Sequence, residues 1–196
     1  MSNYVLYNFR DTPEDVYERL RINIDLNEEF RNSDGVRTTI YSFPMRFIPL
    51  NAKRRDVDTG NGNWNKRYLR GMQVILNVTK GPVMPGKEFF LQAFGREAEE
   101  FKAILLMPDE FIRNRLVPNW RQYSDFEGRL MPYVREWMEG YKGLSQGEKA
   151  LLIQTIGTND KQLIKTAYYG ADNKNLKKMF QCHIGENEII ARYKHG

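Results

Sequence analysis

Two groups of polar residues in the first fifty positions have the types and spacing of a small binding site. Asn8, Arg10 and Asp11 directly follow an apolar run that is typical of a β-strand, while Ser42 and Arg46 lie around the end of a second such run. An arginine side chain presents a planar fork of donors that matches the oxygens of a carboxylate or a phosphate. We therefore predict that Asn8 and Arg46 bind a cofactor or a substrate with an anionic group.

Structural roles compete with binding at these positions. Asp11 stands just before the expected helix start at Thr12 and Pro13, so its carboxylate is better explained by stabilising that helix end. Arg46 could equally pair with a nearby acid. For Asn8 and Arg46 the sequence leaves both roles open.

The common catalytic and metal-binding motifs are missing from the sequence. Its two histidines are His183 and His195 and its single cysteine is Cys182, which excludes HExxH and paired CxxC zinc motifs. It also has no GxxxxGK[ST] phosphate loop and no GxSxG nucleophile motif. We predict a half-buried structural role for Cys182 and no metal site. No catalytic residue is identified.

A second kind of chemistry is indicated by basic residues mixed with aromatic ones in the 53–70 region. The residues concerned are Trp64, Lys66, Arg67, Tyr68 and Arg70. Aromatic side chains that stack on bases, beside cations that contact phosphates, are typical of nucleic-acid binding. The net charge of +5 is compatible with such a partner, although most charges are interspersed with acids.

The elements expected to position the first group form a β–α–β unit. Residues 4–9 and 36–43 have the aromatic and β-branched content of strands, and a helix begins between them at Thr12 and Pro13. Such a unit normally has parallel strands, and ligands bind at their carboxyl ends. Asn8 and Arg46 would then share one rim.

The remainder of the chain has helical periodicity. We expect an α/β part over residues 1–85 followed by an all-helical region over residues 86–196, with Gly71 at a close helix contact. Ser145 and Glu148 form a capping-box pattern. The expected helices cover residues 65–79, 88–106, 108–116, 150–156, 161–169 and 173–183.

Composition indicates a folded protein of the cytoplasm. Hydrophobic residues make up 41% of the 196 residues, which is enough for a core, and no apolar run approaches the roughly 20 residues of a membrane span. The first residues lack the basic segment and apolar run of a signal peptide. We expect no membrane partner.

Two segments carry a resemblance to a known family. The sequence YVLYNFRDTPEDVYERLR from Tyr4 to Arg21, and YSFPMRFIP from Tyr41 to Pro49, resemble the last part of a radical S-adenosylmethionine (radical SAM) iron–sulfur enzyme. The resemblance covers about residues 1–110. It implies that residues 1–85 are the end of a partial (β/α) barrel, closing that barrel and lining the S-adenosylmethionine or substrate site.

The family's CxxxCxxC loop, which binds a [4Fe–4S] cluster, is absent from this sequence. Because such clusters require several thiolates, one cysteine cannot hold one. The resemblance therefore implies that the cluster and S-adenosylmethionine belong to a parent or partner chain, an N-terminal barrel half that carries the loop. On this interpretation the chain is not catalytically competent alone.

The sequence leaves several alternatives open. The chain could be the C-terminal piece of a longer or split enzyme, or a degenerate member of the family that has lost its chemistry. A different class is a small basic module that binds nucleic acid or a protein through residues 53–70 without catalysis. A third alternative is an inactive fragment with an exposed sheet edge, which would tend to aggregate.

Overall fold

The computed structural model describes residues 1–33, 39–51, 63–116 and 125–185. Its elements are β1 (Ser2–Tyr7), α1 (Pro13–Ser33), β2 (Tyr41–Arg46), α2 (Lys66–Thr79), α3 (Lys87–Phe94), α4 (Ala98–Leu106), α5 (Asp109–Leu116), α6 (Asp125–Lys142), α7 (Gln146–Gly157), α8 (Lys161–Gly170) and α9 (Lys174–Ile184). The chain is α/β at its start and helical afterwards, which confirms the predicted fold class at that level. No helix in these ranges is long and apolar enough to cross a membrane.

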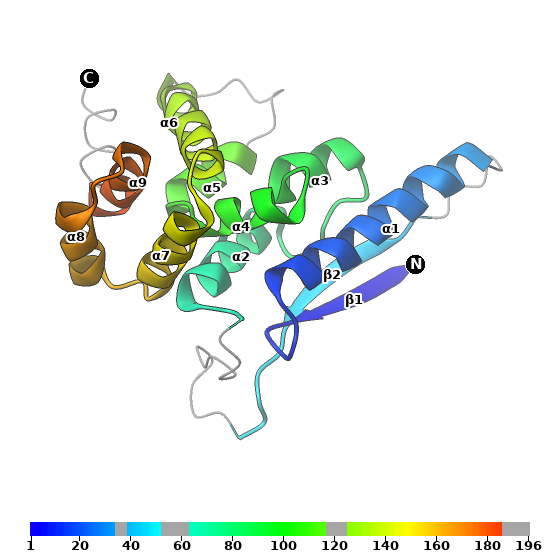
Figure 1. Cartoon of the computed structure of the whole chain (residues 1–196). Helices are drawn as coiled ribbons and strands as arrows, with labels where there is room; N and C mark the ends of the chain where they lie inside the picture. Colours follow the sequence, from blue (N-terminus) through cyan, green and yellow to red (C-terminus); the bar gives the residue numbers. More distant parts are fainter. Residues whose placement is uncertain (34–38, 52–62, 117–124, 186–196) are drawn as a thin grey trace.

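The two strands pair in parallel and α1 connects them, as the sequence predicts. Their register places Tyr4 beside Phe43 and Leu6 beside Met45. Helix α1 lies along one face of this small sheet, at the end of the molecule opposite α8 and α9 (Figure 1). The sheet of β1 and β2 therefore lies at one end of a larger helical body.

The start of α1 is set by a reciprocal cap. The backbone N–H of Thr12 donates to the Asp15 carboxylate at 2.8 Å, and the backbone N–H of Asp15 donates to the Thr12 hydroxyl at 3.2 Å. This arrangement confirms Thr12 as the capping residue and satisfies backbone donors that have no partner inside the helix. The side of α1 that faces the core buries Val16, Tyr17, Leu20 and Ile24.

Strand β2 both begins and ends later than predicted, and residues 36–38 of the predicted strand lie outside the described parts of the chain. The sequence suggested residues 36–43, with Pro44 as the end, whereas β2 continues through Pro44 to Arg46. The backbone N–H groups of Tyr41 and Phe47 both point to β1, where they donate to the Met1 and Tyr7 carbonyls. Donors on a parallel strand alternate in direction, so the Pro44 nitrogen points away from β1. The N–H group that proline lacks would not have bonded to β1, so Pro44 removes no hydrogen bond between β1 and β2.

The helix predicted over residues 88–106 is two helices. Helix α3 ends at Phe94, Gly95 follows with a φ of 87°, and α4 begins at Ala98. This left-handed backbone conformation is one that glycine adopts at little cost. The Gly95 carbonyl accepts a hydrogen bond from the Tyr17 hydroxyl at 3.3 Å, which fastens the break to α1. The apolar spacing of the two helices had concealed the break.

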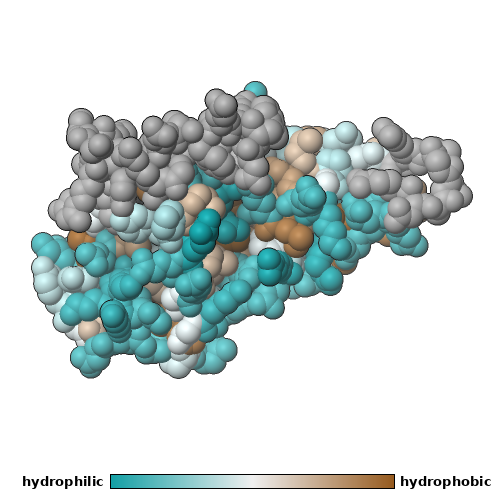
Figure 2. Space-filling model, turned by 90° about the horizontal axis from the view of Figure 1, so that it is seen from above, coloured by the Kyte–Doolittle hydropathy of each residue, from teal (hydrophilic) through white to brown (hydrophobic). Residues whose placement is uncertain are grey.

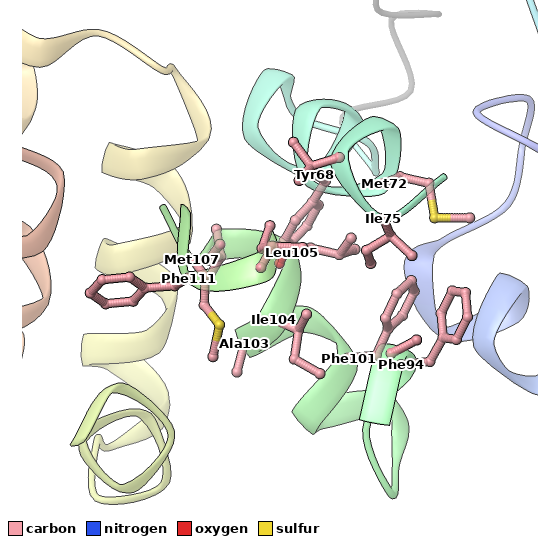
Figure 3. Close-up of a cluster of buried hydrophobic side chains, with 14 of the residues drawn as sticks. Tyr68, Met72, Ile75, Phe94, Phe101, Ala103, Ile104, Leu105, Met107 and Phe111 are labelled. Carbon is pink, nitrogen blue, oxygen red and sulfur yellow. The ribbon is translucent and has the colours of Figure 1, made fainter. Parts of the chain in front are cut away.

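Helix α4 is the centre of the core. It packs against α1, α2, α3, α6 and α7, and Figure 3 shows side chains of α2 directed at those of α4. The buried side chains of α4 are Phe101, Ala103, Ile104, Leu105 and Leu106. Its charged residues Glu99, Glu100 and Lys102 form ion pairs with side chains of α1, α6 and α7.

The prediction of a close contact at Gly71 is confirmed. A Cβ atom at this position of α2 would lie 2.5 Å from the carbonyl oxygen of Leu105 and 2.8 Å from its Cα atom. Both atoms belong to the α4 backbone, which cannot rotate away as a side chain can. The absence of a side chain at Gly71 is what lets α2 and α4 approach this closely.

The end of α4 is capped by side chains from three other helices. The indole N–H of Trp137 donates to the Ala103 carbonyl at 2.9 Å, and His183 Nε2 donates to the Leu106 carbonyl at 2.8 Å. The Arg67 guanidinium donates to the carbonyl of Met107, directly after the helix. Carbonyls at a helix end lack partners within the helix. These three donors satisfy them inside the core, where water is excluded.

His183 should make the fold sensitive to mild acid. Burial lowers the pKa of His183 from 6.5 to about 3, so its ring stays neutral in the folded protein. The unfolded chain takes up a proton near pH 6.5, and the stability contributed by the neutral ring is therefore present above that pH and lost as the pH falls toward 3. We expect the free energy of unfolding by urea to be about 1 kcal/mol lower at pH 5.5 than at pH 7.5.

The matched variant for this measurement is His183→Gln, which keeps a donor but cannot titrate. It should be less stable than the parent at pH 7.5 and nearly independent of pH between 7.5 and 5.5. Most carboxylates remain ionised in this range, so they contribute little to the difference. An equal loss of stability in both proteins would contradict a role for His183.

The C-terminal helices begin where the sequence suggests. Ser145 and Glu148 form the predicted capping box at the start of α7, with both reciprocal bonds present. The hydrophobic core is continuous from Val5 in β1 to Phe180 in α9 and crosses residue 85 without interruption. The division into residues 1–85 and 86–196 stays a prediction.

The face seen in Figure 2 is mostly hydrophilic, with small areas of apolar side chains near its middle.

Candidate anion-binding site

Asn8 ties the carboxyl ends of the two strands together. It follows β1 with a φ of 68°, a left-handed conformation that asparagine tolerates better than most residues. The strand therefore ends at Tyr7, two residues before the predicted end. The side chain is fully buried, and its Nδ2 donates to the carbonyl of Phe47, just past β2, at 3.2 Å. Its Oδ1 is buried without a hydrogen-bond partner, which leaves one acceptor at this rim.

Asp11 has a structural role, but not the predicted one at the helix start, where Thr12 and Asp15 form the cap. The Oδ1 atom of Asp11 accepts the backbone N–H of Phe9 at 2.8 Å, and its Oδ2 pairs with Arg19 of α1 at 2.8 Å. The same guanidinium donates to the Leu6 carbonyl in β1 at 2.8 Å. Asp11 and Arg19 thus fix the turn between β1 and α1, and Asp11 is engaged in the fold.

Arg46 lines a pocket with residues that the sequence assigned to another function. This basic pocket has a volume of about 240 Å³ and is lined by Arg46, Lys66, Leu69, Arg70, Gln73 and Asn159. The α2 residues recur at intervals of three and four, so they share one helix face. The pocket brings together the candidate Arg46 and the candidates Lys66 and Arg70, which had been attributed to competing hypotheses.

Asp109 of α5 pairs with two arginines of α2 at the basic pocket. Asp109 forms ion pairs with Arg67 at 2.9 Å and with Arg70 at 2.6 Å. Burial would raise the pKa of Asp109, but the two arginines outweigh it and the pKa lies below its usual value. One carboxylate thus stands between two guanidinium groups. With Arg46 and Lys66 on the pocket wall, the site favours an anion.

Tyr7 lies beneath this rim and stays protonated. Burial raises its pKa to about 12, and the nearby Arg46 opposes that rise only in part. Its ring packs on Trp64 with 5.2 Å between centroids. The indole Nε1 of Trp64 is buried without a hydrogen-bond partner. The Trp64 Nε1 donor and the Asn8 Oδ1 acceptor are therefore two buried polar atoms with no hydrogen-bond partner among the described residues.

The aromatic residues of the predicted nucleic-acid surface lie in the core. Trp64 is 2% exposed and Tyr68 is 4% exposed, so neither ring offers a face to a base. Arg67 is also buried, between Asp109 and the Met107 carbonyl. The stacking role predicted for Trp64 and Tyr68 is therefore corrected: their spacing is that of core positions on α2 and its N-terminal flank. Residues 53–62 of that region lie outside the described parts of the chain.

Two pocket residues, Gln73 and Asn159, carry no signal in the sequence that marks them as binding residues. Asn159 stands in the turn between α7 and α8 with a φ of 57° and reaches the pocket from a distant part of the chain. Gln73 is one helical turn beyond Leu69 and had no feature that set it apart. Both add amide groups, which can hydrogen-bond to an anion without changing the charge.

The pocket-lining side chains are two arginines, a lysine, two amides and a leucine, a set that can bind an anion. In the described parts of the chain, no group of three or more His, Cys, Asp or Glu is placed to hold a metal ion. Cys182 is on α9, away from the pocket, and burial raises its pKa to about 12, which keeps it a thiol.

No protein-family model matches the chain, and no curated protein or solved structure is significantly similar to it.

Proposed function

We propose that the chain is the C-terminal segment of a radical SAM-type iron–sulfur protein, in which β1, α1 and β2 close a partial (β/α) barrel. The observation that carries this proposal is an apolar sheet face turned away from α1. The register places Tyr41, Phe43 and Met45 alongside Ser2, Tyr4 and Leu6, so these alternate residues share one face.

That face is exposed to an unusual degree. Tyr4 is 69% exposed, Leu6 42%, Tyr41 41% and Met45 51%. Parallel sheets are normally covered on both faces, and a two-stranded sheet is rarely stable alone. In a closed barrel, α1 would lie outside and the exposed face would become the inner wall. This supports an incomplete barrel as the origin of the unit.

The free edge of the sheet is on the side that a barrel requires. On its far side from β1, strand β2 carries an antiparallel bridge from Ser42 to Val83. Strand β1 has no second neighbour among the described residues. Because barrel strands follow one another in chain order, the strand that precedes β1 would add to this edge. A preceding barrel half would therefore dock without rearranging β2.

The residues present do not fit an iron–sulfur cluster. Cys182 is the single cysteine of the chain and remains a thiol, and the described residues hold no cluster of metal ligands. The CxxxCxxC loop would have to lie on a segment outside these 196 residues. This chain would supply barrel closure and the basic pocket, where Arg46 and Lys66 could hold the carboxylate of S-adenosylmethionine or an anionic group of the substrate.

The test is complementation between the two barrel halves. The polypeptide encoded upstream that carries CxxxCxxC is produced together with this chain, and the complex is isolated by size-exclusion chromatography. We expect one complex, which Met45→Asp on the apolar face abolishes. Ile22→Asp is the control, because Ile22 is 51% exposed on α1, outside the sheet. An upstream region without such a loop, or halves that remain separate, would overturn the proposal.

The role of Arg46 is tested on the assembled complex. We expect Arg46→Ala to weaken binding of S-adenosylhomocysteine or of substrate at least tenfold, because a charge-assisted pair is worth about 1.5–3 kcal/mol. Complex formation should be unaffected, since the pocket is not part of the apolar face. Unchanged binding of both ligands would remove Arg46 from the site while leaving barrel closure intact.

For the alternative function of nucleic-acid binding, only the predicted contacts to phosphate groups remain possible. Lys66, Arg70 and Arg46 line one pocket, while the aromatic rings needed for stacking are buried. If this alternative holds, binding of single-stranded RNA should weaken steeply as salt is raised, and Lys66→Gln should reduce that dependence. Absence of binding at low salt would eliminate it.

A further inference from the structure

A second cavity lies apart from the basic pocket and shares none of its residues. It has a volume of about 560 Å³ and lies between α3 and α6, with residues of α4 and α5 contributing to it; we call it the α3–α6 groove. Its apolar part consists of Leu91, Met131, Val134 and Met138. Its volume lies within the range of small-molecule sites in proteins.

One whole side of α6 faces this groove. The lining residues of α6 follow each other at intervals of three, one, three, one and three, which places them on a single helix face. They are Met131, Val134, Arg135, Met138, Glu139 and Lys142. Two of the apolar members are methionines, whose unbranched side chains adapt to ligands of varied shape. The groove is therefore an apolar trough bordered by charges.

Arg115 places a positive charge in the α3–α6 groove that forms no ion pair among the described residues. Its Nη2 donates to the backbone carbonyl of Gln92 at 3.0 Å, and the Gln92 side chain donates in return to the Arg115 carbonyl. These bonds hold the guanidinium in place between α3 and α5. Its Nε atom is buried without a hydrogen-bond partner, and within the described residues Arg115 has no ion pair.

Glu100, the acid whose charge acts on Arg115, is already engaged in other contacts. Its carboxylate pairs with Lys142 at 2.8 Å and accepts the backbone N–H of Arg96 at 2.9 Å. Burial lowers the pKa of Arg115, and the more distant charge of Glu100 offsets this only in part. A partly buried cation whose donors are not all used costs free energy that an anion would recover.

We propose that the α3–α6 groove binds an anionic amphiphile, a carboxylate on an aliphatic body. The carboxylate pairs with the Arg115 guanidinium, while the aliphatic body covers Leu91, Val134 and Met138. Arg96 and Arg135 at the border add a positive field that favours the charged end. This site is independent of barrel closure and of the basic pocket.

The experiment is a calorimetric titration of the whole chain with decanoate below its micelle concentration, compared with decanol. We expect saturable binding of one decanoate and at least tenfold weaker binding of decanol. Arg115→Gln should weaken decanoate at least tenfold and leave decanol unchanged. The control is Arg113→Gln on the same helix, since Arg113 is exposed and paired with Glu110; it should bind as the parent does.

A second variant keeps the test decisive if Arg115→Gln does not fold, as judged by circular dichroism. Met138→Glu places a carboxylate among the apolar residues of the groove and should abolish binding of decanoate and decanol together. The proposal is overturned if decanol binds as tightly as decanoate, if the folded Arg115→Gln variant binds decanoate normally, or if Met138→Glu has no effect. Failure of decanoate to bind the parent chain overturns it as well.

Discussion

Gly71→Ala should destabilise the fold by about 2–3 kcal/mol, although alanine is the better helix former by about 1 kcal/mol. The added Cβ would lie 2.5 Å from the Leu105 carbonyl oxygen. To relieve the clash between this Cβ atom and the Leu105 backbone, α2 and α4 must separate by about an ångström. That movement loosens the packing around Phe101 and Ile104. We expect the midpoint of thermal unfolding to fall by about 5–10 °C.

The matched control is Gly147→Ala in α7. A Cβ atom at Gly147 meets nothing within 4 Å, so this substitution changes helix propensity alone. It should leave the protein unchanged or stabilise it by up to about 1 kcal/mol. If both variants behave alike in thermal and urea unfolding, the close approach of α2 to α4 is not a feature of the folded chain.

Asp109→Ala should cost about 3–5 kcal/mol, which would leave little of the stability of an ordinary domain. Arg67 is 5% exposed, and the substitution removes the carboxylate that faces it 2.9 Å away. Arg70 loses the same partner. Asp109 also stands in the first turn of α5, where a negative charge interacts favourably with the helix dipole. The free energy of unfolding by urea measures the loss.

Two comparisons show whether charge burial is the cause. Glu136→Ala removes an ion pair with Lys178 in which both side chains are about half exposed, and it should cost less than about 1 kcal/mol. The double variant Arg67→Met with Asp109→Leu should recover part of the stability, because apolar residues can replace a buried pair. Equal effects of Asp109→Ala and Glu136→Ala would contradict a buried network.

Local signals in the sequence were sufficient to predict much of the β–α–β unit, whose strands end near Asn8 and Arg46. The cap at Thr12, the parallel pairing of the strands and the glycine contact at Gly71 follow from residue type within a few positions. Pro44 was misread as a strand end because its effect depends on which side of the strand its nitrogen faces. That direction is set by pairing with β1, which the local sequence does not contain.

The candidate site was predicted only in part, for a similar reason. Arg46 was identified as a binding residue from its place after a strand, and the structure places it in a pocket. Its companions came from other parts of the chain: Asp109 is 39 residues from Arg70, and Asn159 lies in a turn between two late helices. The burial of Trp64 and Tyr68 likewise depends on α4 and β1, so their side-chain types alone could not reveal it.

The central place of α4 has a consequence for the order in which the chain can become structured during synthesis. The apolar side of α1 finds its partners in α3 and α4, and the end of α4 is satisfied only when α6 and α9 have been made. The early β–α–β unit thus lacks packing partners until α3 and α4 have been made, and α4 lacks its caps until α9 has been made. A nascent chain in that interval exposes the strands and α1 together, so folding should proceed in one late, cooperative step and depend on chaperones before it.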